Sequence, residues 1–163
     1  MTRSTVVAAA GEYVTGGRFL ADMQARLAIP SESPREDSGP DHLRYLNEEM
    51  RPLLEGMGFT CQILPNPKLE RIPALFAERI EDPALPTVLT YGHGDVLWGM
   101  AGDWKENRSP WEAKLAGDRI YGRGIVDNKG QHALNLAALQ LVLETRGSLG
   151  FNVKVLIEMG EES

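Results

Sequence analysis

The chain has 163 residues, of which 42% are hydrophobic and 25% charged, and this is the composition of an ordinary soluble globular protein with one core. Its net charge of -6 argues against a nucleic-acid-binding surface, which requires a concentrated basic patch. The longest N-terminal apolar stretch, residues 6–10, is too short for a signal peptide, and no segment approaches the length of a membrane span. The single cysteine, Cys61, excludes an internal disulfide and is expected to be a buried spectator. We therefore expect a cytoplasmic protein that binds neither nucleic acid nor membrane.

The first third of the chain predicts two helices joined by a loop. Residues 12–27 carry apolar side chains at roughly helical spacing, and Pro30 ends that pattern. Residues 30–40 are rich in proline, serine and charge, so we expect an exposed loop there. A second amphipathic helix is predicted over residues 41–57, with Pro52 kinking it or dividing it into two pieces.

The rest of the chain alternates strands with loops and one long helix. Strands are predicted over residues 59–64, 74–80, 87–91, 119–121 and 151–158, and a helix over 133–146. Residues 92–116 form a loop too long for a simple connection, which indicates a functional loop. This order predicts an α/β domain with at least partly parallel strands. In such sheets functional groups collect beyond the carboxyl ends of the strands, here residues 92–95 and 160–162.

The first candidate site follows the strand at residues 87–91, in the sequence Gly92-His93-Gly94-Asp95. A histidine that binds a metal usually donates its other N–H group to a carboxylate, and Asp95 is placed for that role. The flanking glycines would let the backbone turn sharply. The alternative is a polar turn that happens to contain a histidine.

The second candidate is Asp127, where a glycine-rich loop meets the long helix. An aspartate at this point is also a natural helix N-cap, although one carboxylate can both cap a helix and bind a metal. The glycine-rich loop invites a phosphate-binding interpretation as well. Its spacing fits neither the dinucleotide fingerprint nor the phosphate loop, which argues against nucleotide binding.

The third candidate is the pair Glu161 and Glu162 after the last predicted strand. In a regular strand the two side chains would face opposite sides, but Gly160 indicates that the chain has already left the strand. Two carboxylates beside a cation can divide the work, one binding metal and the other moving a proton. The alternative is a solvated acidic chain end. Together the three loop ends offer the imidazole and carboxylate ligands that zinc-type sites use.

Three segments of the chain match a known family in order and spacing: YGHGDVLWG, GDRIYGRGIVDNKGQ and IEMGEES, all within residues 87–163. They resemble the zinc-dependent exopeptidases and deacylases, the group of aminoacylase, glutamate carboxypeptidase, acetylornithine deacetylase and succinyl-diaminopimelate desuccinylase. The resemblance implies a three-layer αβα catalytic domain with a mostly parallel mixed sheet. It also implies two divalent metal ions, zinc in the first place, with cobalt or manganese as alternatives.

The resemblance further implies a role for each candidate residue. His93 would bind one metal and Asp95 would orient it, while Asp127 would bridge both metals. Glu162 would bind the second metal, and Glu161 would be the general base that takes a proton from the attacking water. The substrate would be a small peptide or an N-acyl amino acid, cleaved at its amide bond.

The resemblance implies enzymes of roughly twice the length of this chain or more. Residues 1–163 are therefore expected to be the N-terminal portion of the catalytic domain, without the lid and dimerisation domain and the C-terminal catalytic segment. Each metal would then lack one protein ligand, and the full-length enzyme would be a homodimer. The alternative is that the chain is a non-catalytic fragment of such an enzyme, inactive alone.

Other polar residues receive only structural roles. His132 is expected in packing or at the surface, and His42 on an exposed helix face. Arg123 and Lys129 are expected to balance the nearby carboxylates. The three tryptophans are expected to pack the long loop onto the domain.

Overall fold

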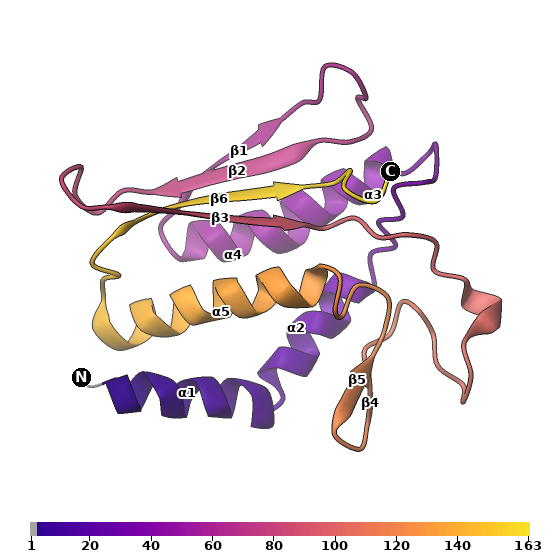
Figure 1. The fold of residues 1–163 in the computed structure, drawn as a ribbon, viewed down its shortest axis with the longest axis horizontal. Helices are drawn as coiled ribbons and strands as arrows, with labels where there is room; N and C mark the ends of the chain where they lie inside the picture. Colours follow the sequence, from indigo (N-terminus) through magenta and orange to yellow (C-terminus); the bar gives the residue numbers. More distant parts are fainter. Residues whose placement is uncertain (1–2) are drawn as a thin grey trace.

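The computed structural model describes residues 3–163 and is built around a four-stranded sheet (Figure 1). The strands stand in the order β1 (Thr60–Leu64), β2 (Ala74–Arg79), β6 (Asn152–Glu158) and β3 (Thr87–His93). A separate hairpin joins β4 (Lys114–Ala116) to β5 (Arg119–Tyr121). The helical elements are α1 (Arg3–Thr15), α2 (Arg18–Leu27), α3 (Gly39–Arg44), η1 (Tyr45–Met50), α4 (Arg51–Gly56), η2 (Ala101–Asp103) and α5 (Lys129–Arg146).

The mixed α/β sheet predicted from the sequence is confirmed. Its parallel part is smaller than predicted, because β3 pairs with β6 in parallel while β1–β2 and β2–β6 are antiparallel. The parallel pair runs in register from Thr87 opposite Asn152 to His93 opposite Glu158. Both strands therefore end at the same edge of the sheet, where their following loops meet.

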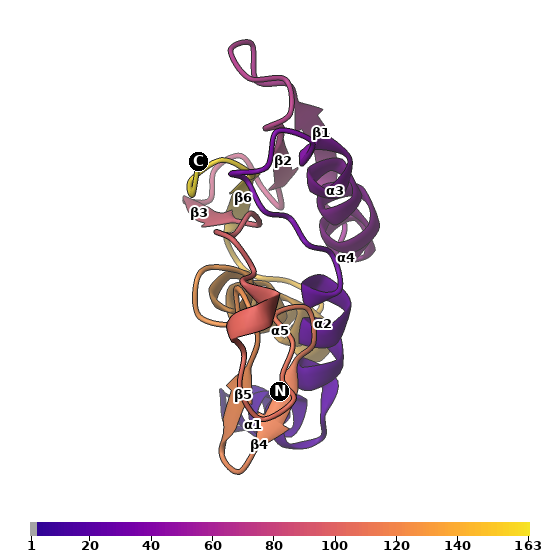
Figure 2. The same cartoon turned by 90° about the vertical axis from the view of Figure 1, so that its right-hand side faces the viewer.

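The core lies between one face of the sheet and the helices. In β6 the side chains of Val153, Val155 and Ile157 are buried, whereas the residues between them are partly exposed. This alternation is expected of a strand with one covered face. Figure 2 shows α3 and α4 on one side of β1, β2 and β6. Among residues 3–163 no helix covers the opposite face, so the described part of the chain provides two of the three predicted layers.

The predicted N-terminal helix over residues 12–27 is instead two helices. Helix α1 already begins at Arg3, and the chain turns at Gly16 and Gly17 before α2. Gly17 has φ of +86°, a left-handed conformation that glycine adopts without steric cost and that ends a helix. None of the helices in the described chain is long and apolar enough to cross a membrane.

The second predicted helix is continuous from α3 through η1 to α4, and Pro52 does not break it. The segment just before the proline, Tyr45–Met50, is a π-helix. Proline has no N–H group for the helical ladder, and a wider π turn is one way in which a helix accommodates such a gap. Prolines therefore need not end an element whose apolar face is firmly packed.

Two expectations of exposure in this region are wrong. In the predicted exposed loop, Ser31, Ser33 and Ser38 are fully buried. The Ser31 hydroxyl donates to the carbonyl of Gly94 at 2.6 Å, which ties this loop to the candidate site. His42 is also buried rather than exposed, and its Nδ1 lies 2.7 Å from the carbonyl oxygen of Arg71. Polar composition predicted solvent contact, but Ser31 and His42 instead satisfy backbone groups inside the protein.

Replacing leucine by alanine should lower the free energy of unfolding by different amounts on the two faces of the sheet. Leu75 in β2 is fully buried, whereas Leu89 in β3 is 66% exposed. Leu75→Ala should lower the free energy of unfolding by about 2–5 kcal/mol, because it leaves a cavity. Leu89→Ala should change it by less than about 0.5 kcal/mol. Urea unfolding followed by circular dichroism measures both, and equal losses would contradict the one-sided core.

Candidate metal centre

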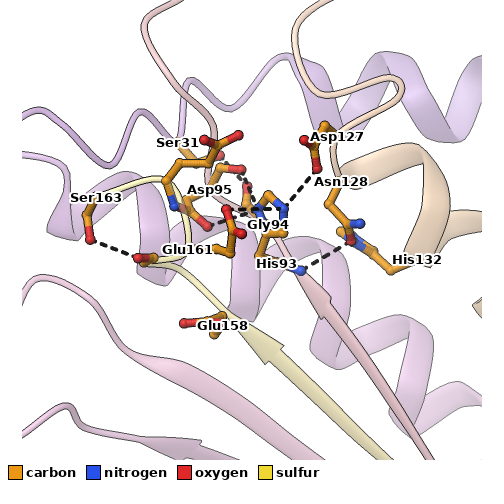
Figure 3. Close-up of polar contacts among 12 residues, drawn as sticks. Ser31, His93, Gly94, Asp95, Asp127, Asn128, His132, Glu158, Glu161 and Ser163 are labelled. Atoms are coloured by element: carbon orange, nitrogen blue, oxygen red, sulfur yellow. Dashed lines mark hydrogen bonds and ion pairs between the residues drawn. The ribbon is translucent and has the colours of Figure 1, made fainter.

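His93 is the last residue of β3, and its imidazole lies between two carboxylates (Figure 3). Nδ1 is 3.2 Å from Oδ1 of Asp95, and Nε2 is 3.1 Å from Oδ1 of Asp127. Asp95 is fully buried, whereas the Asp127 side chain is 68% exposed. One ring nitrogen therefore faces the interior of the protein, and the other faces the open edge of the sheet.

The glycines on either side of His93 are required by close packing. A Cβ atom at Gly92 would lie 2.8 Å from Cβ of His132, and one at Gly94 would lie 2.4 Å from Cε1 of Tyr45. Neither glycine is among the residues with positive φ, so the sharp turn expected from the sequence is not the reason for them. They allow two buried side chains to contact the backbone that carries His93.

Glu161 and Glu162 stand in the turn that follows β6. The N–H group of Glu162 donates to Oδ2 of Asp95 at 3.0 Å, which fixes this turn beside His93. One ligand atom from each of His93, Glu161 and Glu162 lies within 4.8 Å of the others, and Oε2 of Glu161 is 4.0 Å from Nε2 of His93. The two glutamates thus lie at one site, as Gly160 predicted, and the Glu161 side chain is half exposed.

Asp127 approaches the same histidine from the loop before α5. The N-cap of that helix is Asn128, so the interpretation of Asp127 as the cap is wrong. The peptide bond between the two residues is cis. Asp127 contacts His93 but lies outside the group formed by His93, Glu161 and Glu162. All five predicted residues are therefore neighbours, with Asp127 on one side of the imidazole.

Carboxylate groups outnumber cationic groups at this edge of the sheet. Burial alone would lower the pKa of His93, but its contacts with Asp95 and Asp127 outweigh burial and raise it to about 9. Burial and repulsion from Asp127 and Glu161 raise the pKa of Glu162. A divalent cation would relieve this repulsion, and imidazole with carboxylate oxygens is a donor set that zinc accepts. The residues present therefore fit a metal ion.

Several residues at the site were not predicted from the sequence to take part in it. The side chain of Asn128 accepts the backbone N–H of His93, and the Tyr45 hydroxyl contacts the His132 ring. His132 is buried, which agrees with packing rather than surface exposure, the two roles expected for it. A histidine four residues after an asparagine at a helix start was a weak signal for such a contact.

Lys129, which was expected to balance the nearby carboxylates, has backbone carbonyl groups as its hydrogen-bond partners. It is fully buried and donates to the carbonyl oxygens of Arg26 and Ile29 at 2.9 and 2.8 Å. Burial lowers its pKa to about 7. Its contacts tie the start of α5 to the end of α2, because a long flexible side chain can reach carbonyls that a helix leaves unpaired.

The fold matches that of solved peptidase catalytic domains. Human carnosine dipeptidase 1 superposes with a TM-score of 0.82 at 26% identity, over 97% of this chain and 35% of that one. Residues 89–163 match the model of the peptidase family M20/M25/M40. The resemblance drawn from the sequence motifs is therefore confirmed.

Curated relatives include enzymes of two kinds. A succinyl-diaminopimelate desuccinylase of Rhodospirillum centenum is 36% identical over 139 residues, which is 83% of this chain and 33% of the relative. A Cys-Gly metallodipeptidase of Candida albicans is 29% identical over 160 residues, which is 90% of this chain and 32% of the relative. The chain thus spans about a third of the length of these relatives.

The buried histidine beside the site predicts a pH effect on stability. Burial, with the nearby charges of Arg26 and Lys129, lowers the pKa of His132 from 6.5 to about 3. Between these values the unfolded chain binds a proton that the folded chain does not, so the free energy of unfolding falls as the pH falls. In His132→Gln this contribution is absent. The difference in the free energy of unfolding between the wild type and the variant should therefore shrink from pH 7 to pH 4.5 in urea titrations. A constant difference would contradict the lowered pKa of His132.

Proposed function

We propose that the protein is a metal-dependent hydrolase that cleaves an amide bond of small peptides or N-acyl amino acids. The observation that carries the proposal is the convergence of His93, Glu161 and Glu162 ligand atoms within 4.8 Å at the end of a parallel strand pair. The family match and the amide-cleaving relatives point to the same class of reaction. Both a desuccinylase and a dipeptidase are similar to this chain, so both substrate classes are candidates.

The metal ligands follow from the positions of the side chains. We assign His93 to one divalent ion, Glu162 to a second, and Asp127 to a bridging position between them, with zinc preferred over cobalt or manganese. Nε2 of His93, which lies 3.1 Å from Oδ1 of Asp127, supports this assignment. When bound, such ions would polarise the amide carbonyl and make a water molecule easier to deprotonate, and so a better nucleophile.

Two further carboxylates act through protons and orientation. Asp95 is buried and contacts Nδ1 of His93, so it holds the ring with Nε2 directed outward. Glu161 is half exposed and 4.0 Å from Nε2 of His93, a position from which it can take a proton from attacking water. It would then return that proton to the leaving amine. Such general-base catalysis contributes about 10²–10⁴-fold in rate.

We propose further that residues 1–163 correspond to the N-terminal portion of a longer catalytic domain. The relatives are about three times as long, and one face of the sheet has no helical cover among the described residues. In the whole enzyme further segments would supply one more ligand to each metal, a lid and a dimer interface. A cytoplasmic location stays a prediction.

The second candidate is a non-catalytic fragment that binds metal without turnover. One observation favours it: Asp127, the proposed bridge, lies outside the ligand group and is 68% exposed. A bridging carboxylate without a complete second set of ligands could hold one ion but not a catalytic pair.

Hydrolysis assays distinguish the two candidates. With zinc present, the purified chain is incubated with a dipeptide and an N-succinyl amino acid, and the released amine is measured. The hydrolase proposal expects turnover that falls about 10²–10⁴-fold in Glu161→Gln, because the general base is lost. The control is Glu55→Gln, an exposed glutamate in α4.

Each outcome decides between the candidates. Turnover that Glu161→Gln abolishes and Glu55→Gln leaves intact supports the hydrolase. Zinc binding without turnover of either substrate supports the fragment. Turnover that is equal in the wild type and Glu161→Gln would contradict the role of Glu161.

A further inference from the structure

A line of hydrogen bonds runs through the protein interior to the backbone of His93. The Tyr45 hydroxyl lies 2.6 Å from Nε2 of His132, and Nδ1 of His132 lies 3.3 Å from Oδ1 of Asn128. The same Oδ1 accepts the backbone N–H of His93 at 3.2 Å. The line begins on η1, passes through the first turn of α5 and ends on the last residue of β3 (Figure 3 shows its His93 end).

The direction of each hydrogen bond in this line is fixed by chemistry. The backbone N–H of His93 can only donate, so the group of Asn128 that faces it is the carbonyl oxygen. That oxygen can only accept, so Nδ1 of His132 carries the proton. Burial lowers the pKa of His132 to about 3, and the neutral ring therefore accepts at Nε2 from the Tyr45 hydroxyl. One tautomer satisfies every group.

The same residues also contact the strand by packing. Tyr45 is fully buried and His132 is 2% exposed. The two side chains press against Gly94 and Gly92, the residues on either side of His93, at distances that exclude any Cβ atom. The backbone of His93 is therefore clamped from both sides and bonded at its amide.

We propose that Tyr45, His132 and Asn128 form a positioning relay that holds the backbone of His93 so that its imidazole meets the metal. This inference rests on the proposed function, because it requires His93 to be a metal ligand. In this proposal none of the three side chains is itself a metal ligand. They act through His93, as groups behind a metal ligand commonly do, where their loss costs about 10–100-fold in metal affinity or activity.

Asn128 has a second contact that keeps its amide in this orientation. Its Nδ2 donates to Oε1 of Gln131 at 2.9 Å, one turn along α5. Tyr45 stands at the other end of the relay. The Lys129 ammonium lies 4.8 Å from the centre of its ring. Both ends of the relay are therefore anchored to residues of the first turn of α5, and the helix start is the rigid element that carries it.

The test measures zinc affinity of the purified chain by calorimetric titration in competition with a chelator. Tyr45→Phe removes one hydroxyl and keeps the buried ring, and it should weaken zinc binding about tenfold. Tyr13→Phe is the matched control, because Tyr13 is also buried and its hydroxyl donates to Asp22 at 2.7 Å, away from the site. It should leave zinc affinity unchanged even where both variants lose similar stability.

A second variant tests whether the residues act as one unit. Asn128→Ala should weaken zinc binding about 10–100-fold. Adding Tyr45→Phe should weaken it no further, because Tyr45 acts on His93 only through Asn128 and the two substitutions are therefore not additive. Additive losses would show two independent structural effects and would overturn the relay. Unchanged affinity in Tyr45→Phe and Asn128→Ala would overturn it as well. If the wild type binds no zinc, the proposed function fails first, which is a separate result.

Discussion

The in-register parallel pairing of β3 with β6 is the constraint on which the rest of the structure depends. It sets His93 opposite Glu158, so the loops after both strands start at the same level of the sheet. The backbone N–H of Gly94 donates to the carbonyl of Glu158 at 2.9 Å and extends the pairing beyond the last strand residue. A shift of one residue would turn every side chain of one strand to the other face and separate His93 from Glu161.

The charge at this edge is tolerated because most of it is paired or hydrated. Asp95, the most buried carboxylate, accepts the N–H of Glu162 and contacts His93, and these interactions lower its pKa despite the burial that would raise it. The Asp127 side chain is largely exposed to water, and that of Glu161 is half exposed. The edge is therefore stable as an open acidic surface and still favours a cation. Burying all four carboxylates without one would be far more costly.

Much of this could be predicted from the sequence, because strands, motifs and loop ends are local signals. The strand over residues 119–121 and those near 59–64, 74–80, 87–91 and 151–158 were predicted within two residues. The antiparallel share of the sheet was missed, since strand direction depends on tertiary packing. The burial of Ser31, His42 and Lys129 was also missed. Their partners are backbone carbonyls distant in sequence, which composition does not reveal.

The central claim is a metal centre that depends on His93, one of three histidines in the chain. X-ray absorption at the zinc edge of the metal-loaded protein tests it most directly. If His93 binds the metal, the spectrum should show nitrogen and oxygen ligands at about 2.0–2.2 Å with the scattering pattern of one imidazole, and that pattern should be lost in His93→Gln. An imidazole pattern that survives in His93→Gln, or a sulfur ligand from Cys61 at about 2.3 Å, would contradict it.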